Sequence, residues 1–280
     1  MTRVAIIGSP DKELATETME RLRRWLADRA EIVFAKLTYA SDQVLAAAPE
    51  ILFVLGGDGT LIAAAHNLRR RQLPLVGINL GKLGFLTEFT IDQIESEGEF
   101  LFSGSPPITR RVMLHVRLEH RDGSRIETMA VNDCVVLAGP PFGMVFMSVE
   151  ADGNELAEVR GDGLIVATPS GSTAHNLSAG GPILEPTAEA IILTPICPHT
   201  LSFRPLTMDV GHELVVRMTQ ANKGTTVAID GHYCHPFEPG DSLVLTRYAA
   251  DFMLVRNPRH SVWHILRRKL HWAQHPQNGM

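Results

Sequence analysis

Short apolar runs alternate with amphipathic stretches over the first hundred residues. The runs Val4–Gly8, Ile51–Leu55 and Pro74–Ile78 are apolar at nearly every position, which is typical of strands buried on both faces of a sheet. Leu14–Leu26 instead carries its apolar residues at helical spacing. Two further elements fit the same alternation, a strand at Glu31–Ala35 and an Ala-rich helix at Leu61–Leu68. The pattern predicts an α/β domain, in which a parallel sheet has helices on its faces.

The pattern changes near Ser103–Thr109, where Gly104, Pro106 and Pro107 mark a joint. Beyond this joint helices become scarce, and the sequence predicts an all-β or strand-dominated region. The expected strands are Val112–Glu119, Arg125–Leu137, Met144–Ala151, Glu155–Arg160, Leu214–Thr219, Thr225–Ile229 and Ser242–Arg247.

The tail differs from both regions. Asp251–Val255 is a predicted strand, and Ser261–Trp272 is a predicted amphipathic helix with Arg267, Arg268 and Lys269 near its end. Cations near a helix C-terminus complement the helix dipole, so this cluster is interpreted as a solvated face rather than as a binding site.

Composition narrows the function classes. The chain has 280 residues, 45% of them hydrophobic, which is enough for one large domain or two moderate ones with a real core. A net charge of −5 argues against a protein that mainly coats nucleic acid or an anionic membrane. Three scattered cysteines, no signal-peptide pattern and no long apolar run predict a cytoplasmic protein without a membrane partner.

The sharpest local motif is Gly56-Gly-Asp-Gly-Thr60, which follows a predicted buried strand and opens a helix. Glycines let the backbone approach a ligand closely, and amides at a helix N-terminus bind phosphate. Asp58 would then accept a proton from an attacking hydroxyl or hold Mg²⁺ against the phosphates. The alternative is a tight strand–helix turn with an N-cap aspartate. Neither a Walker A nor a Gly-x-Gly-x-x-Gly loop occurs.

Two more loops carry candidate chemistry. In Gly77–Glu88, Gly81 and Gly84 allow a close loop, and Phe85 offers a flat face to a base or else belongs to the core. The run Val159–Pro182 is crowded with small hydroxyl residues, which suit ribose or phosphate oxygens but also suit a capped helix start.

Two polar clusters are ambiguous. Asn132 and Asp133 sit inside an apolar run, where they either tie the strand to a loop or face a ligand's hydroxyls. His232 and Cys234 would share a face of a strand, but no further ligand at zinc spacing appears, so surface residues are favoured over a metal site.

Taken together, the order and spacing of these motifs resemble the NAD kinase family over nearly the whole chain, from Val4 to about Trp272. The glycine–aspartate pentapeptide is shared with lipid and sphingoid kinases, whereas the later runs are more specific. The motifs are Gly56-Gly-Asp-Gly-Thr60, Gly81-Lys-Leu-Gly-Phe-Leu86, Asn132-Asp133, Asp162-Gly-Leu-Ile-Val, Thr168-Pro-Ser-Gly-Ser-Thr-Ala-His175, Ile196-Cys-Pro-His-Thr-Leu-Ser202 and Arg204-Pro-Leu.

The resemblance implies an α/β domain at residues 1–108, a β-sandwich-like NAD-binding domain at 109–248, and a strand and helix at 249–280 that return to the first domain. It implies transfer of a phosphoryl group from ATP, or another phosphate donor, to the 2′-hydroxyl of the adenosine ribose of NAD, giving NADP. It also implies a divalent cation, Mg²⁺ being expected, and a homodimer or homotetramer.

The resemblance further implies roles for residues. Asp58 would accept the proton of the 2′-hydroxyl, and Phe85 would pack near the adenine. Asn132 and Asp133 would bind ribose hydroxyls, and Asp162 would contact the nicotinamide part. The remaining expected contacts are Gly56, Gly57, Gly59 and Thr60 in the phosphate loop, and Arg160, Thr173, Ala174, His175, Asn176, Leu177, Ser178 and His232 around the dinucleotide.

The chain departs from the family at two positions. The family commonly has Glu at Asp133 and Tyr at His175. The shorter carboxylate favours a contact through water, and the imidazole stacks with less area and a titratable charge. We therefore expect weaker, pH-sensitive binding of NAD.

Two other functions fit part of the pattern. A lipid or sphingoid kinase would share the pentapeptide but would need an apolar groove, which the hydroxyl-rich loop argues against. A non-catalytic dinucleotide-binding regulator would have no use for a base at Asp58.

Overall fold

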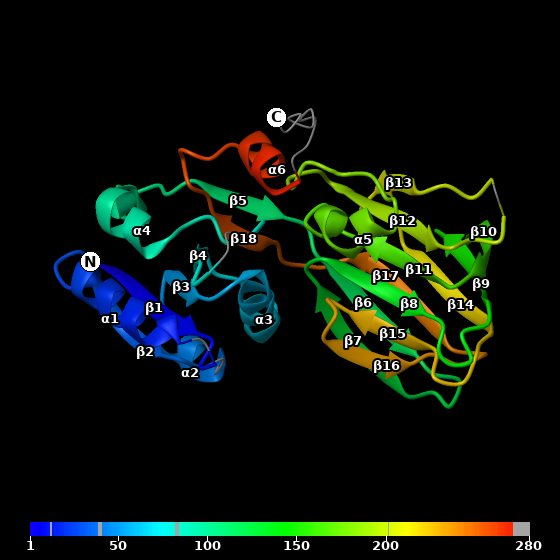
Figure 1. The fold of residues 1–280 in the computed structure, drawn as a ribbon. Coiled ribbons are helices and arrows are strands. Elements are labelled where there is room, and N and C mark those ends of the chain that lie inside the picture. Colours follow the sequence, from blue (N-terminus) through cyan, green and yellow to red (C-terminus); the bar gives the residue numbers. More distant parts are fainter. Residues whose placement is uncertain (12, 39–40, 82–83, 201, 271–280) are drawn as a thin grey trace, which may run out of the picture. The chain divides into compact units, whose positions relative to one another are not determined.

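The computed structural model describes residues 1–11, 13–38, 41–81, 84–200 and 202–270 (Figure 1). The chain divides into two compact units. The first unit comprises residues 1–68, 73–109 and 253 onward, and the second unit comprises residues 69–72 and 110–252. The predicted strand Asp251–Val255 and the predicted tail helix belong almost entirely to the first unit.

The first unit contains one six-stranded sheet in the order β2-β1-β3-β4-β18-β5, with parallel pairing from β2 through to β18. The predicted parallel sheet is thereby confirmed. Strand β18, from the end of the chain, lies between β4 and β5 (Figure 1). The strands are β1 (Thr2–Gly8), β2 (Ala30–Lys36), β3 (Ile51–Leu55), β4 (Leu75–Ile78), β5 (Ile108–Arg111) and β18 (Phe252–Val255).

Helices flank this sheet because their apolar stripes need cover. Helix α1 buries Leu22 and Leu26 in one core with Ile6 and Phe53 of the strands, to which α4 adds Ile94. The helices of this unit are α1 (Leu14–Leu26), α2 (Ser41–Ala46), α3 (Asp58–Leu68), α4 (Ile91–Glu97), the 3₁₀ helix η1 (Gly98–Phe102) and α6 (Val262–Leu270).

Some helix predictions need adjustment. The helix expected at Leu61–Leu68 begins earlier, at Asp58, because the glycine-rich pentapeptide itself turns into the helix. The expected helix Ser261–Trp272 is described as Val262–Leu270, and residues 271 and 272 lie outside the described residues. Helices α2, α4 and η1 were not predicted from the sequence.

The second unit is a sandwich of two six-stranded antiparallel sheets that share one apolar core. The first sheet is ordered β10 (Asn154–Gly161), β9 (Val145–Ala151), β14 (Leu214–Gln220), β17 (Ser242–Arg247), β6 (Leu114–Glu119), β7 (Arg125–Ala130). The second is ordered β13 (Leu206–Asp209), β12 (Ala190–Ile196), β11 (Gly163–Ala167), β8 (Asp133–Leu137), β15 (Thr226–Ile229), β16 (Tyr233–Pro236). Two short helical segments, η2 (Gly171–Thr173) and α5 (His175–Ser178), follow β11.

The prediction of one strand at Arg125–Leu137 is wrong. The chain crosses from one sheet to the other at Val131 and Asn132, so that β7 and β8 belong to different sheets. The break is hard to see in the sequence because residues 129–131 and 134–137, on either side of it, are all apolar. Strand β8 is apolar because it is buried on both faces, and its outer face packs with Ile165 and Ile192.

No helix in the described parts of the chain has the length and apolarity needed to cross a lipid bilayer.

Candidate functional site

The glycine-rich pentapeptide joins the end of β3 to the start of α3 in the first unit. A Cβ on Gly56 would lie 2.2 Å from Thr60 Oγ1, so only glycine fits the turn. Added Cβ atoms on Gly57 and Gly59 would instead meet nothing within 4 Å. The backbone is therefore open on the side where the first amides of a helix have no intrahelical acceptor, which is the arrangement that a phosphate needs.

The Asp58 carboxylate is held by the loop that follows β4. The amide of Phe85 donates to Oδ2 at 2.7 Å, and the amides of Leu86 and Thr87 both donate to Oδ1 at 3.0 Å. The Thr87 hydroxyl adds a contact of 3.2 Å to Oδ1. A Cβ on Gly84 would lie 1.8 Å from Oδ1, so this glycine is required for the approach. The two predicted motifs Gly56–Thr60 and Gly81–Leu86 thus form one structure, of which Lys82 and Leu83 lie outside the described residues.

Phe85 is half-buried, with its ring 6.0 Å below the ammonium of Lys269 from helix α6. The interpretation of the tail cluster as a solvated face overlooked this contact. Nothing in the helical pattern indicated it, because it depends on where β18 inserts in the sheet.

In the second unit the crossing between β7 and β8 is tied to two other segments. The Asp230 carboxylate accepts hydrogen bonds from the amides of Val131, Asn132 and Asp133 at 2.9, 2.7 and 3.1 Å. Thr168 donates from its amide to the Asn132 carbonyl at 2.8 Å and from its hydroxyl to the Val131 carbonyl at 2.6 Å. The structure therefore brings the Asn132–Asp133 pair, the hydroxyl-rich loop and the Asp230–His232 turn together.

Asp230 was missed by the sequence analysis, although Asp230-Gly231 is a typical turn signal. Its three hydrogen bonds show that the backbone amides of Val131, Asn132 and Asp133 tie the crossing to a turn. The expectation that the side chains of Asn132 and Asp133 face a ligand's hydroxyls stays a prediction. The side chains are left for other partners.

Charge and burial make Asp133 unusual. The side chain is almost fully buried, at 4% exposure, and burial together with the nearby Asp230 carboxylate raises the pKa of Asp133 to about 7. Within the described residues, the buried oxygens Asn132 Oδ1 and Ser170 Oγ have no hydrogen-bond partner. Unpaired buried acceptors of this kind fit a site that a ligand's hydroxyls would satisfy.

The predicted residues of the hydroxyl-rich loop divide into two groups. His175 and Ser178 are exposed, and Thr173 and Ala174 are half-buried. Asn176 differs from the expectation of a ligand contact because it is completely buried. Its amide nitrogen donates to the carbonyls of Ser172 and Pro182, and its oxygen accepts from Thr194. Both polar atoms of the Asn176 side chain therefore bind within the protein and shape the loop. The next residue, Leu177, is half-buried.

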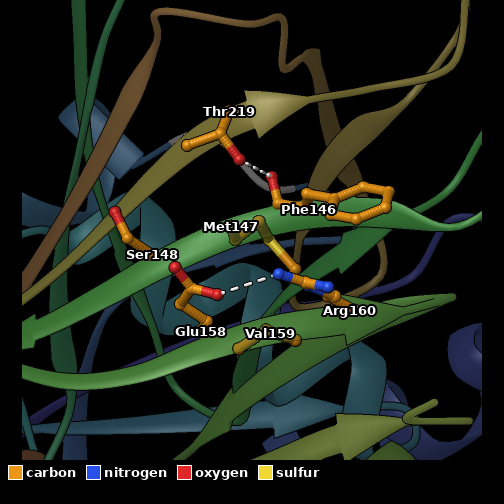
Figure 2. Close-up of a pocket in the computed structure, with 7 residues that line it drawn as sticks. All are labelled: Phe146, Met147, Ser148, Glu158, Val159, Arg160 and Thr219. Carbon is orange, nitrogen blue, oxygen red and sulfur yellow. Dashed lines mark hydrogen bonds and ion pairs between the residues drawn. The ribbon is translucent and has the colours of Figure 1, made fainter.

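Arg160 and Asp162 lie on exposed positions at the end of β10 and the start of β11. Arg160 points along the surface toward Glu158, at 3.1 Å, and lies over the Phe146 ring, 5.4 Å from its centroid (Figure 2). Arg160, Glu158 and Phe146 line a pocket of about 110 Å³ together with Thr219. Because the Arg160–Glu158 pair is exposed, it contributes little to stability and leaves the guanidinium accessible.

His232 is also exposed, and its Nδ1 lies 2.8 Å from the Asp230 carbonyl oxygen, which leaves Nε2 as the outward nitrogen. Neither His232 with Cys234 nor any other part of the described chain gathers three or more His, Cys, Asp or Glu side chains that could hold a metal ion.

Comparison with known proteins gives a consistent family. The model of the ATP-NAD kinase N-terminal domain matches residues 4–104, and that of the ATP-NAD kinase C-terminal domain matches residues 131–257. An NAD kinase from Rhodopirellula baltica is 36% identical over 97% of this chain and 87% of its own length. An NAD kinase from Syntrophobacter fumaroxidans is 37% identical over 98% of this chain and 100% of its own.

Solved structures share the fold. Yeast NADH kinase complexed with NADH has a TM-score of 0.87 at 23% identity, covering 100% of this chain and 90% of that one. An NAD kinase from Archaeoglobus fulgidus in complex with ATP has a TM-score of 0.74 at 26% identity, covering 92% and 94%. The chain belongs to the ATP-NAD kinase family.

Proposed function

We propose that the protein transfers a phosphoryl group from ATP, or from another phosphate donor, to the 2′-hydroxyl of the adenosine ribose of NAD, giving NADP. The observation that carries this proposal is the position of Asp58, a fixed carboxylate at the N-terminus of α3 beside the open backbone of Gly57 and Gly59. Phosphoryl transfer needs chiefly positioning and charge stabilisation, which a helix N-terminus and a backbone loop provide.

The hydrogen bonds around Asp58 indicate which oxygen takes the proton. A carboxylate oxygen has two lone pairs, and Oδ1 already receives three donors. Oδ2 receives only the Phe85 amide, which leaves one lone pair. We assign Oδ2 as the acceptor of the 2′-hydroxyl proton.

The remaining residues are proposed to hold the dinucleotide. Phe85 would face the adenine, and Asn132 and Asp133 would bind ribose hydroxyls, a role that the unpaired Asn132 Oδ1 and the buried Asp133 carboxyl support. Exposed Asp162, His175 and the other outward residues of the loops would complete the contacts; these are Arg160, Thr173, Ala174, Ser178 and His232. Asn176 is proposed instead to shape the loop from within.

A divalent cation, Mg²⁺ in the first instance, is proposed to accompany ATP. Mg²⁺ is usually held by substrate phosphates and water with at most one or two carboxylates, rather than by a protein cage, so the phosphates of ATP would supply much of its coordination. The cation would neutralise charge on the phosphates, while Asp58 positions the hydroxyl.

The direct test is incubation of the purified protein with ATP, Mg²⁺ and NAD, followed by detection of NADP with an NADP-specific dehydrogenase. NADP should form only when all three are present. Parallel reactions with polyphosphate, NADH, diacylglycerol and sphingosine would identify the donor and test the lipid-kinase alternative. Phosphorylation of a lipid without formation of NADP would contradict the proposal. Binding of NAD without turnover would favour the alternative of a non-catalytic dinucleotide-binding regulator.

Assembly and location remain predictions. We propose a homodimer or homotetramer in the cytoplasm. Light scattering coupled to size-exclusion chromatography would test the assembly, with a monomer as the contradicting result.

A further inference from the structure

Thr87 is a buried residue in the loop that holds Asp58, and it contacts the carboxylate with both its amide and its hydroxyl. The side chain is completely inaccessible to solvent, and the Oγ1–Oδ1 distance is 3.2 Å. The hydroxyl could in principle rotate and donate its proton elsewhere, so its role depends on what its other neighbours require.

Two donors fix the direction of this hydroxyl. Asn79 Nδ2 donates to Thr87 Oγ1 at 2.9 Å, and the Gly84 amide donates to it at 3.0 Å. A hydroxyl has two lone pairs and one proton. With both lone pairs occupied, the proton of Thr87 has Asp58 Oδ1 as its acceptor.

The orientation of Asn79 is fixed in turn. The Gly81 amide donates to Asn79 Oδ1 at 2.5 Å, which requires the oxygen of the amide to face Gly81 and the nitrogen to face Thr87. A chain of hydrogen bonds therefore runs from Gly81 through Asn79 and Thr87 to Asp58, and every donor in it points toward the carboxylate.

We propose that Thr87, supported by Asn79, is a positioning residue for the phosphoryl transfer. Resting on the proposed function, this inference gives the Thr87 hydroxyl the task of a third donor to Oδ1, which fixes the rotation of the carboxylate so that Oδ2 faces the ribose hydroxyl. A misplacement of a fraction of an ångström in a catalytic base lowers turnover without weakening binding of the substrate.

The test compares Thr87→Val, which removes the hydroxyl at nearly constant volume, with Thr87→Ser, which retains it. We expect Thr87→Val to lower kcat about 10- to 100-fold, since the lost bond is to a charged group, with the KM for NAD within about twofold of the unmodified enzyme. Thr87→Ser should restore kcat to within about threefold. Thr90→Val is the matched control, because the Thr90 hydroxyl caps helix α4 and makes no contact with this chain of bonds.

Asn79→Asp provides a second variant that does not depend on how Thr87→Val folds. The new carboxylate would accept the Thr87 proton and draw it from Asp58, so kcat should fall to a similar extent. A kcat within twofold of the unmodified enzyme in either Thr87→Val or Asn79→Asp, or an equal loss in the Ser and Val variants, would overturn the inference. Absence of NADP formation by the unmodified protein would instead refute the proposed function.

Discussion

Asp58 accepts four hydrogen bonds while its Oδ2 atom keeps one lone pair for a substrate. We expect Asp58→Asn to lower turnover by about 10²–10⁴-fold, the usual contribution of a general base, because an amide cannot take the proton. Binding of NAD, followed by isothermal titration calorimetry, should change little. Near-normal turnover would contradict the role of Asp58, and the exposed Asp28→Asn should behave as the unmodified enzyme.

Asp133 makes stability depend on pH in an unusual direction. Its pKa is about 7 in the folded protein, above the ordinary aspartate value of 3.8, because burial and the Asp230 carboxylate disfavour the charge. The folded state therefore binds more protons between these two values, and the contribution of Asp133 to stability falls as the pH rises through this window.

Asp133→Asn tests this dependence. The substitution removes the charge, so it should stabilise the protein at pH 8, on the order of 2 kcal/mol, and by less at pH 5. Denaturant unfolding at the two pH values measures the difference. A gain that is equal at both, or larger at pH 5, would show that Asp133 is not the titrating group.

Single residues also show how far the sequence could predict the site. The glycines around Asp58 indicated a loop of open backbone, and the structure has such a backbone at Gly57 and Gly59. The binding roles of Asn132, Asp133 and the loop after β11 stay predictions. The sequence could not distinguish Asn176, whose amide faces inward, from His175 beside it, since inward and outward orientation depends on tertiary packing.

At the scale of elements, the loop holding Asp58 is anchored to β18 by a buried ion pair. Glu88 follows Thr87 and lies 2.7 Å from Arg256 Nε, with 1% and 16% of the two side chains exposed. The Asn257 amide donates to the other Glu88 oxygen at 2.8 Å. Replacement of one partner of such a pair leaves a buried charge without compensation.

We therefore expect Arg256→Met to destabilise the first unit by about 3 kcal/mol, and addition of Glu88→Gln to recover part of the loss. Tryptophan fluorescence during denaturation follows the unfolding of the first unit selectively. All three tryptophans, Trp25, Trp263 and Trp272, belong to that unit, and none lies in residues 69–72 or 110–252. Additive losses in the double variant would mean that the two side chains do not interact energetically.

Elements were predictable where the local pattern agreed with the final environment. The uniformly apolar β3 and the amphipathic α1 were predicted with correct bounds, since both patterns follow directly from burial. The division of 125–137 into β7 and β8 was not, because it depends on the distant Asp230. Helix α4 was missed although Thr90 and Gln93 form a capping box.

At the scale of the whole molecule, the two units differ in whether their cores come from one continuous stretch of sequence. The core of the sandwich comes entirely from residues 112–245. The core of the first unit includes Val255, and its sheet needs β18 between β4 and β5. A fragment of residues 1–109 would therefore leave strand edges unpaired in the middle of its sheet.

We predict that residues 110–252 fold alone, that residues 1–109 do not, and that joining 1–109 to 253–280 restores the first unit. The Thr109 hydroxyl donates to the Leu254 carbonyl at 3.2 Å, and the Arg256 amide donates to the Pro107 carbonyl at 2.8 Å. These bonds place the two ends side by side, so a flexible linker of about four residues can connect them. Circular dichroism during thermal unfolding distinguishes the cases. A cooperative transition in residues 1–109 alone would show that β18 is dispensable for the sheet that carries Asp58.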